Sequence, residues 1–235
     1  MNRRDFLAVS ALGLAVPAIL NVQSEQAAAS TPGRVLFTLP KSSERRVAWT
    51  VDDGFSQQTV AGYINKLQAN PDIKVTFFVT SSASPWSKHA KAIRELIDLG
   101  QVQVANHTHT HAPLTHIRTS KVINELSSCK KFLEDKYGVS GETFYRPPYG
   151  YYDDRVRSIA AELGYTDTVM WMGTLADAGK NTQRGIFRNA DKWMKNGRIV
   201  IGHANYPMIL KDFDSIVSLL GKRGLQTVTL NEVYY

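Results

Sequence analysis

The sequence predicts an α/β fold in which parallel strands curl into a distorted (β/α)7 barrel. Three observations predict it. Short apolar segments alternate with segments that have helical spacing, polar residues follow most of the apolar segments directly, and a length of 235 residues suits one barrel domain. Strict alternation of strand and helix implies parallel strands with helices outside them. The alternative is a doubly wound open sheet, which the same alternation permits.

Strands are expected where short runs of β-branched, aromatic and other apolar residues occur. These runs are residues 46–51, 75–80, 102–105, 143–146, 168–172, 199–201 and 226–230. Helical patterns lie between them at residues 57–67, 88–99, 120–137, 153–163, 185–195 and 213–220. Glycines directly after the pattern end three of these helices, at Gly100, Gly138 and Gly164. The order predicts seven β-α units without an internal repeat or a second domain.

The first 29 residues have the layout of an export signal. Arg3 and Arg4 precede an apolar run at residues 8–20, and small residues at 27–29 offer a cleavage site. The arginine pair indicates the twin-arginine route. An uncleaved anchor is the alternative, but a bilayer span needs about 20 apolar residues.

The chain therefore divides into a signal peptide (1–29), a lead-in segment (30–44) and a catalytic domain (45–235). After cleavage we expect no stable membrane insertion and a periplasmic, cell-wall or secreted location.

The charge and composition of the chain indicate which classes of partner it can bind. Twenty-eight Lys and Arg against 21 Asp and Glu give a net charge of +7, which favours anionic surroundings such as cell-wall polymers and also promotes solubility. No basic low-complexity arm or zinc-finger spacing indicates nucleic acid. The single cysteine, Cys129, excludes an intramolecular disulfide, so the core and a bound metal are left to hold the fold. The sequence leaves the oligomeric state open.

Histidines cluster directly after the third expected strand. His107 and His111 are four residues apart, so a helical turn or a tight loop places both on one face, while His109 points away. Imidazole and carboxylate are standard zinc ligands, and a catalytic zinc keeps one position open for water. An aspartate from another strand end would complete the set. His89 and His116 stand alone and are expected to be ordinary buried or surface residues.

Two aspartates, Asp52 and Asp53, follow the first expected strand and precede Gly54. Side chains of adjacent residues diverge, so one carboxylate can bind a metal while the other faces the water as a general base. The alternative is a turn-forming Asp-Asp-Gly sequence. Because working residues of such barrels sit at the carboxyl ends of the strands, we expect the aspartates beside the histidines.

Four motifs, in this order, resemble those of the NodB-homology polysaccharide deacetylases, carbohydrate esterase family four. The family's T-F-D-D-G corresponds to TVDDG at residues 50–54, and its H-[ST]-x-x-[HD] to HTHTH at residues 107–111. Its R-x-P-[YF] corresponds to RPPY at 146–149, and its L-x-H to IGH at 201–203. The motifs span most of the chain after the signal, and four matches in order are far more specific than any one alone.

The resemblance implies a metal centre and a base. Asp53, His107 and His111 would hold a divalent metal, with Zn²⁺ favoured and Co²⁺ or Ni²⁺ as alternatives. Asp52 would be the general base. Arg146 would pair with Asp52 and keep it ionised, because a nearby cation favours the charged form of a carboxyl group.

The resemblance also implies an acid and an oxyanion donor. His203 would protonate the leaving amine, Asp177 would orient His203, and the backbone N–H of Tyr149 would stabilise the oxyanion. The fourth motif departs from the family, because Asp177 is followed by Ala178 where a tryptophan is common. Trp171 lies six residues before Asp177, as the family often shows.

The expected reaction is removal of N-acetyl groups from a glycan, with peptidoglycan, chitin-like oligomers and poly-N-acetylglucosamine as candidate substrates. An acetyl esterase acting on acetylated xylan would use the same residues. An inactive carbohydrate-binding protein of the same fold is the other alternative, and its mark would be loss of the base, acid or ligands. Aromatic residues near strand ends are candidates for a glycan groove: Trp86, Tyr149, Tyr151, Tyr152 and Tyr206.

Overall fold

A computed structural model describes residues 31–235, so the signal peptide expected at 1–29 lies outside the described residues. Among the described residues, the strands are β1 (Arg34–Leu36), β2 (Arg46–Asp53), β3 (Val75–Val79), β4 (Val102–Asn106), β5 (Phe144–Tyr145), β6 (Asp167–Val169), β7 (Gly173–Thr174), β8 (Arg198–His203) and β9 (Gln226–Thr227). They form one sheet in the order β1-β6-β5-β4-β3-β2-β8-β7, with β9 beside the start of β2. Every pairing between these strands is parallel.

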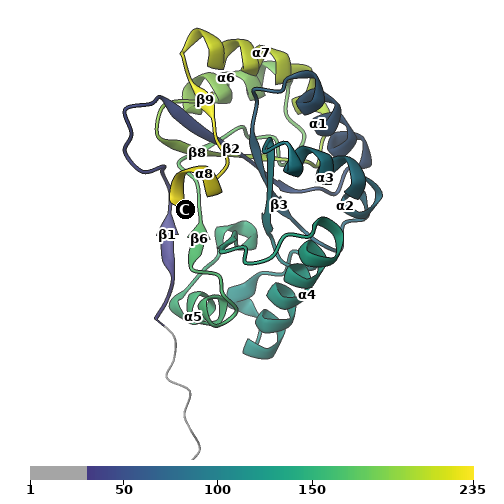
Figure 1. The fold of residues 1–235 in the computed structure, drawn as a ribbon, viewed down its shortest axis with the longest axis vertical. Coiled ribbons are helices and arrows are strands. Elements are labelled where there is room, and N and C mark those ends of the chain that lie inside the picture. The colour runs from purple at the N-terminus through teal and green to yellow at the C-terminus, as the bar shows by residue number, and fades with distance from the viewer. Residues whose placement is uncertain (1–30) are drawn as a thin grey trace, which may run out of the picture.

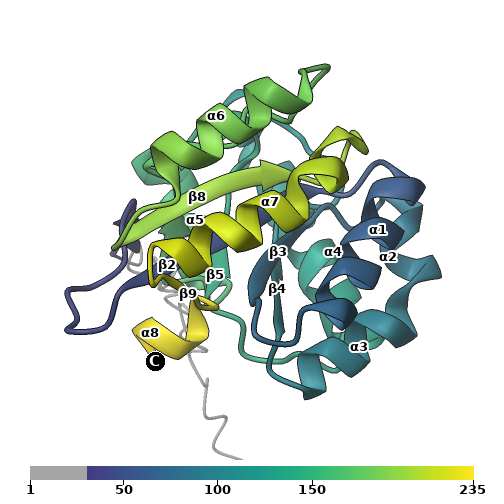
Figure 2. The ribbon, with the colours of Figure 1, turned by 90° about the horizontal axis from the view of Figure 1, so that it is seen from above.

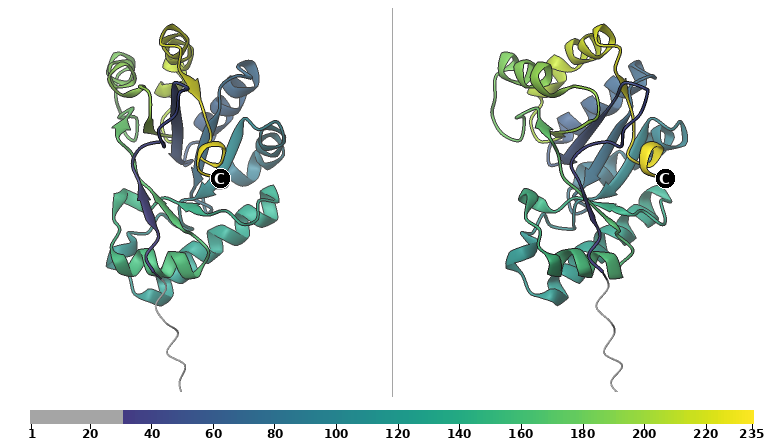
Figure 3. Two further views of the ribbon diagram at one scale, coloured as in Figure 1. Left: turned by 60° about the vertical axis from the view of Figure 1, so that its left-hand side comes forward. Right: turned by 90° about the vertical axis from the view of Figure 1, so that its left-hand side faces the viewer.

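The α-helices are α1 (Gln57–Ala69), α2 (Ser84–Lys88), α3 (Ala90–Asp98), α4 (Thr119–Tyr137), α5 (Asp154–Glu162), α6 (Gln183–Trp193), α7 (Met208–Lys222) and α8 (Asn231–Tyr234). Two 3₁₀ turns add η1 (Leu114–His116) and η2 (Pro148–Gly150). Successive contacts of α6, α7, α1, α3, α4 and α5 make an arc around the outside of the sheet (Figures 1 and 3). Figure 2 shows α6 and α7 running beside β8, and the two helices pack against each other.

The curled sheet with its helices on the outer side confirms the predicted distorted (β/α)7 barrel. A doubly wound sheet would carry helices on both faces. Within residues 31–235 the edge strands β1 and β7 do not pair with each other, and the segment after β1 meets β8 only through an isolated antiparallel bridge between Thr38 and Arg198. No helix in the same part of the chain is long and apolar enough to cross a membrane.

Side chains alternate along the strands between an outer and an inner cluster. Val47, Trp49 and Val51 of β2 pack with the helices, whereas Ala48 joins the inner cluster. The other buried members of the inner cluster are Leu39, Phe78, Ala105, Phe144, Val169, Ile199, Val228 and Leu230. Because strand side chains have a period of two, the inner series continues from Ala48 to Asp52, and the other strands place their polar ends inward in the same way.

Strand β1 lies in the lead-in segment (30–44), before the first strand that the sequence predicts. It pairs in register with β6, and the Arg34 guanidinium binds the buried Asp167 carboxylate through Nε at 2.7 Å. The strand expected at 168–172 also differs. It ends at Val169, and the chain then crosses to β7, which pairs with β8.

The remaining differences are two additional short helices and a shortened last strand. A separate short helix, α2, precedes α3, with proline in its first turn. The last expected strand keeps only Gln226–Thr227, and α8 follows it. Leu230, Val233 and Tyr234 then pack against the inner cluster, so α8 covers the amino-terminal end of the barrel.

Glu142 is a buried carboxyl group beside this end of the barrel. Its side chain accepts hydrogen bonds from the Phe144 N–H at 2.9 Å and from Gln103 Nε2 at 3.3 Å. Burial nevertheless raises the pKa of Glu142 to about 7. The folded protein therefore holds a proton that the unfolded chain releases at lower pH. The resulting contribution to stability is present at acidic pH and is lost as the pH rises through about 7.

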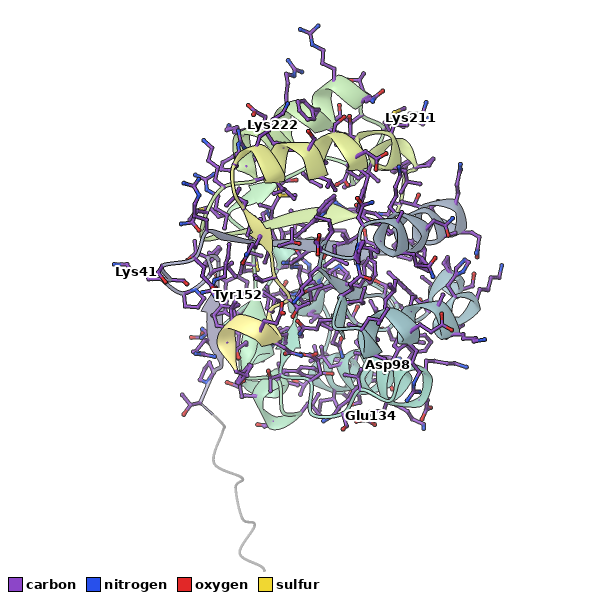
Figure 4. All side chains as sticks on the ribbon, turned by 45° about the horizontal axis from the view of Figure 1, so that its top comes forward. Lys41, Asp98, Glu134, Tyr152, Lys211 and Lys222 are labelled. Atoms are coloured by element: carbon purple, nitrogen blue, oxygen red, sulfur yellow. The ribbon has the colours of Figure 1, made fainter. Side chains whose placement is uncertain are left out.

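We predict that Glu142→Gln changes stability little at pH 5 and raises the free energy of unfolding by about 1–3 kcal/mol at pH 8, because glutamine stays neutral. Urea denaturation at both pH values measures the difference. Glu134→Gln is the control, since Glu134 is exposed on α4 (Figure 4). An equal effect of Glu142→Gln at both pH values would contradict the prediction.

Candidate metal centre and active site

A cavity of about 550 Å³ opens at the carboxyl ends of the strands. Six of the eight residues singled out in the sequence line it: Asp52, Asp53, His107, His111, Tyr149 and His203. The other two, Arg146 and Asp177, are buried behind them. The structure therefore brings the ends of β2, β4 and β8 and the segment after β5 to one space, as the position of working residues in α/β barrels predicts.

Asp53, His107 and His111 form a compact group of possible metal ligands. The Asp53 Oδ1 atom lies 3.1 Å from His107 Nε2 and 3.0 Å from His111 Nε2. The three ligand atoms lie within 4.8 Å of one another. Burial opposes ionisation of Asp53, but the two imidazoles outweigh it and the pKa of Asp53 is lowered.

The hydrogen bonds around this group suit a cation. Asp53 Oδ2 accepts a hydrogen bond from Asn205 Nδ2 at 2.6 Å, whereas the buried Oδ1 has no hydrogen-bond partner. His107 Nδ1 donates to the Arg146 carbonyl at 2.7 Å, which leaves the Nε2 lone pair facing Asp53. An unpaired carboxylate oxygen and two imidazole nitrogens thus converge on one point, so these residues fit a divalent metal.

A strained turn aims Asp53 at the site. Asp53 and Gly54 both have left-handed backbones, with φ of +70° and +90°. A Cβ atom at Gly54 would lie 2.2 Å from the Trp86 indole, so only glycine fits there. Trp86 Nε1 donates to the Asp53 carbonyl at 2.6 Å and is fully buried. Trp86 was one candidate for a glycan groove, with core packing as the alternative, and its side chain instead supports the turn from the core.

A tight loop, rather than a helical turn, places the two histidines. Thr108 and His111 have φ of +69° and +61°. Asn106 Oδ1 accepts from the Thr108 N–H at 2.8 Å, and Thr108 Oγ1 accepts from the His111 N–H at 3.1 Å. Glu125 Oε2 accepts a hydrogen bond from the Thr110 N–H at 2.7 Å. These bonds offset the cost of the left-handed residues and fix His111 beside His107.

The other histidines lie apart from this group. His109 Nδ1 meets the Ser81 hydroxyl at 2.9 Å, so the ring points away from the candidate ligands. His89 contacts Gln57, and His116 packs edge-on against Tyr151.

Asp52 is held by a fully buried arginine. Arg146 Nη1 donates to Asp52 Oδ1 at 2.6 Å, and the guanidinium lies 4.0 Å from the centre of the Phe78 ring. The other guanidinium hydrogen bonds go to Thr50 Oγ1 and to the carbonyls of Val169 and Met170. Burial lowers the pKa of Arg146, and the Asp52 carboxylate opposes that change. Asp52 Oδ2 lies 3.7 Å from His107 Nε2, beside the candidate ligands.

His203 is held twice by Asp177. Asp177 Oδ1 lies 3.1 Å from His203 Nδ1, and Oδ2 accepts from the His203 backbone N–H at 3.1 Å. Burial lowers the pKa of His203, but the Asp177 hydrogen bond and the charges of Asp52, Asp177 and Asp53 outweigh it, so the pKa is raised. The structure thus brings the predicted pair together although the fourth motif departs from the family.

Two small residues, Gly202 and Ala178, lie near this pair. A Cβ atom at Gly202 would lie 3.0 Å from Leu175 Cδ1 and 3.2 Å from Asp177 Oδ2, so glycine leaves the room that Asp177 occupies. Ala178 lines the cavity itself.

Asn205 is a residue of the site that the sequence motifs do not indicate. Its amide joins the two loops by donating to Asp53 and accepting from the Phe55 N–H at 3.2 Å. Its position two residues after His203, just past a strand end, is the signal that marks it.

Comparisons with known proteins agree with this geometry. Residues 40–168 match the family model described as polysaccharide deacetylase. The peptidoglycan-N-acetylglucosamine deacetylase PgdA of Listeria monocytogenes is 27% identical over 246 residues, which cover 99% of this chain and 50% of that protein. Chitin deacetylase 1 of Cryptococcus neoformans is 36% identical over 155 residues, which cover 66% of this chain and 30% of that protein. The chain thus matches half or less of the length of these two relatives.

Among solved structures, the family 4 carbohydrate esterase from Streptomyces lividans in complex with acetate has a similar fold. The TM-score is 0.71 at 25% identity, and the match covers 80% of this chain and 94% of that one.

We predict that Arg146→Met lowers the free energy of unfolding by about 3–5 kcal/mol, because it leaves the Asp52 carboxylate buried without its partner. Adding Asp52→Asn should recover part of the loss, since the unpaired charge is then removed. Urea denaturation of both variants tests this coupling. Wild-type stability of Arg146→Met, or no recovery in the double variant, would show that the pair does not support the fold.

Proposed function

The chain belongs to the polysaccharide deacetylase family, and we propose that it is a metal-dependent hydrolase that removes N-acetyl groups from a glycan. One observation carries the proposal: the candidate ligands, a carboxylate held by a buried arginine and a histidine held by a buried aspartate face one cavity. Amide hydrolysis needs an activated water, a stabilised oxyanion and a proton for the leaving nitrogen. This cavity offers a group for each task.

The proposed metal ligands are Asp53, His107 and His111. Zn²⁺ is the proposed metal, with Co²⁺ or Ni²⁺ as alternatives, because two imidazoles and a carboxylate form a common catalytic zinc site. When bound, such a metal lowers the pKa of water and polarises a carbonyl group. Asn205 supports the set by holding Asp53 Oδ2, which keeps Oδ1 turned toward the imidazoles.

Asp52 and His203 are the proposed base and acid. Arg146 Nη1 occupies Asp52 Oδ1, so Oδ2 is the oxygen that takes the proton of the attacking water. The Asp177 contact occupies His203 Nδ1, which leaves Nε2, on the opposite side of the ring, to protonate the leaving amine. The backbone N–H of Tyr149 is the proposed second donor to the oxyanion.

The proposed substrate is an N-acetylated glycan of the peptidoglycan or chitin type, the polymers named for the two curated relatives. Residues 1–29 are proposed to direct export by the twin-arginine route, so that the enzyme acts in the periplasm, at the cell wall or outside the cell. The net charge of +7 suits an anionic wall.

We predict that the mature protein releases acetate from N-acetylglucosamine oligomers or peptidoglycan, that a chelator abolishes release and that added zinc restores it. His107→Ala should lower the rate by at least about 100-fold, because it removes a metal ligand. His109→Ala is the matched control and should keep most of the activity, since His109 points away. Acetate from acetylated xylan alone would identify an esterase, and no acetate from folded, metal-loaded protein would identify a binding protein.

We predict a second, pH-dependent signature from Asp177→Asn. Asparagine keeps the shape but removes the charge that helps to raise the pKa of His203. His203 then loses its proton at lower pH, so the basic limb of the pH profile of kcat shifts to lower pH by roughly one unit. The acidic limb is the internal control. An unshifted basic limb would show that His203 is not the acid.

A further inference from the structure

The Asp177 carboxylate is buried without a permanent positive charge beside it. Within residues 31–235, no lysine or arginine forms an ion pair with Asp177, and its charged partner is His203 at 3.1 Å. The proposed base differs, because the Arg146 guanidinium lies 2.6 Å from Asp52. A buried carboxylate is costly unless other groups pair with it or donate hydrogen bonds to it. Asp177 therefore needs neutral donors for the part of the reaction in which His203 has given up its proton.

Two such donors lie behind Asp177, on the outer side of the sheet. Trp49 Nε1 of β2 and Tyr63 OH of α1 are buried polar atoms that have no hydrogen-bond partner in the part of the chain that the structure describes. An unpaired buried donor is destabilising. The Asp177 carboxylate has acceptor capacity to spare, because each of its oxygens makes one contact with His203 and a carboxylate offers about four acceptor positions.

The position of Gly202 shows that the indole and the carboxylate share one space. A Cβ atom at Gly202 would lie 3.2 Å from Asp177 Oδ2 and 3.6 Å from Trp49 Nε1. Both atoms therefore face the room that glycine leaves on the outer side of β8. The same point lies 3.0 Å from Leu175 Cδ1, so an apolar side chain borders this space.

The Tyr63 hydroxyl belongs to the same group. Its ring packs edge-on against the Trp49 ring, with ring centres 6.3 Å apart. Burial raises the pKa of Tyr63 well above its usual value, the charge of Asp177 raises it further, and the Trp49 indole opposes the change. The hydroxyl therefore keeps its proton, and it lies close enough to Asp177 to respond to the carboxylate charge.

Aromatic packing holds both donors in place. The ring of Phe213 on α7 lies 5.0 Å from that of Trp49 and 6.1 Å from that of Tyr63. The ring of Phe77 on β3 lies 6.0 Å from that of Tyr63. Donors with fixed positions can stabilise a charge without the cost of reorganising themselves.

We propose that Trp49 and Tyr63 are positioning residues for the proposed acid, and that they act on Asp177 through one shared, buried water molecule. The inference rests on the proposed function, which makes His203 the acid. Buried waters typically make about three hydrogen bonds to polar groups that otherwise lack partners, and they bridge groups too far apart for a direct bond. This water accepts from the indole and the hydroxyl and donates to Asp177, so the carboxylate keeps its orientation whether His203 is charged or neutral.

The first test is a double-mutant cycle on acetate release. Tyr63→Phe keeps the ring, and it should lower kcat by about 3–10-fold and change KM by less than about 2-fold, because the acid acts in the transition state. In the Asp177→Asn background the same change should lower kcat by less than about 2-fold, since Tyr63 acts through the carboxylate. Tyr145→Phe is the matched control, because it deletes a buried hydroxyl that accepts from Thr168 Oγ1 instead. Equal losses of kcat from Tyr63→Phe in both backgrounds would overturn the proposal.

A crystal structure of the wild-type protein, at a resolution that shows ordered water, separates this proposal from the proposed function. We expect one water within about 3.2 Å of Trp49 Nε1, Tyr63 OH and an oxygen of Asp177. Such a water would support the network even if wild type released no acetate, an outcome that would refute only the deacetylase. Dry packing, with no water shared by these three side chains, would overturn the proposal.

Discussion

The buried pair of Arg146 and Asp52 is the interaction on which the candidate site depends. Two charges removed from water are stable only when each keeps its partner and its hydrogen bonds. Arg146 meets that condition by bonding to β2, to the last residue of β6 and to the residue after it, and by lying over Phe78 of β3. Its own carbonyl fixes His107. Arg146 therefore fixes the position of the proposed base relative to a candidate metal ligand.

The period of the strands explains why much of this site could be predicted from the sequence. Asp52 lies four residues after Ala48 on β2, so both side chains point to the inner face of the sheet. His203 lies four residues after Ile199 on β8 and points to the same face. By the same alternation, the Asp53 side chain would point to the outer face of the sheet. It reaches the site because its backbone is left-handed, and Gly54 and Trp86 permit that turn. No periodic pattern indicates such a residue, so its assignment came from the histidines nearby and the family resemblance.

Features that depend on distant partners could not be predicted. Strand β1 has only three residues and is defined by its pairing with β6, far along the chain. The crossing from β6 to β7 occurs within one apolar run, which carries no local break signal. Asn205 acts through a contact with Asp53 that no local pattern specifies. Local patterns and motifs predicted most of the strands and most of the chemical residues, whereas contacts between residues far apart in the sequence decide which side chains meet.

The most direct test of the metal centre is a crystal structure of the mature protein with Zn²⁺, with diffraction data collected on both sides of the zinc absorption edge. We expect one anomalous peak bound by Asp53 Oδ1 and by Nε2 of His107 and His111, at about 2.0–2.2 Å. An open coordination position should face the cavity that Asp52 and His203 line. Zinc bound at another site, with none at these three residues, would contradict the metal centre and the mechanism built on it.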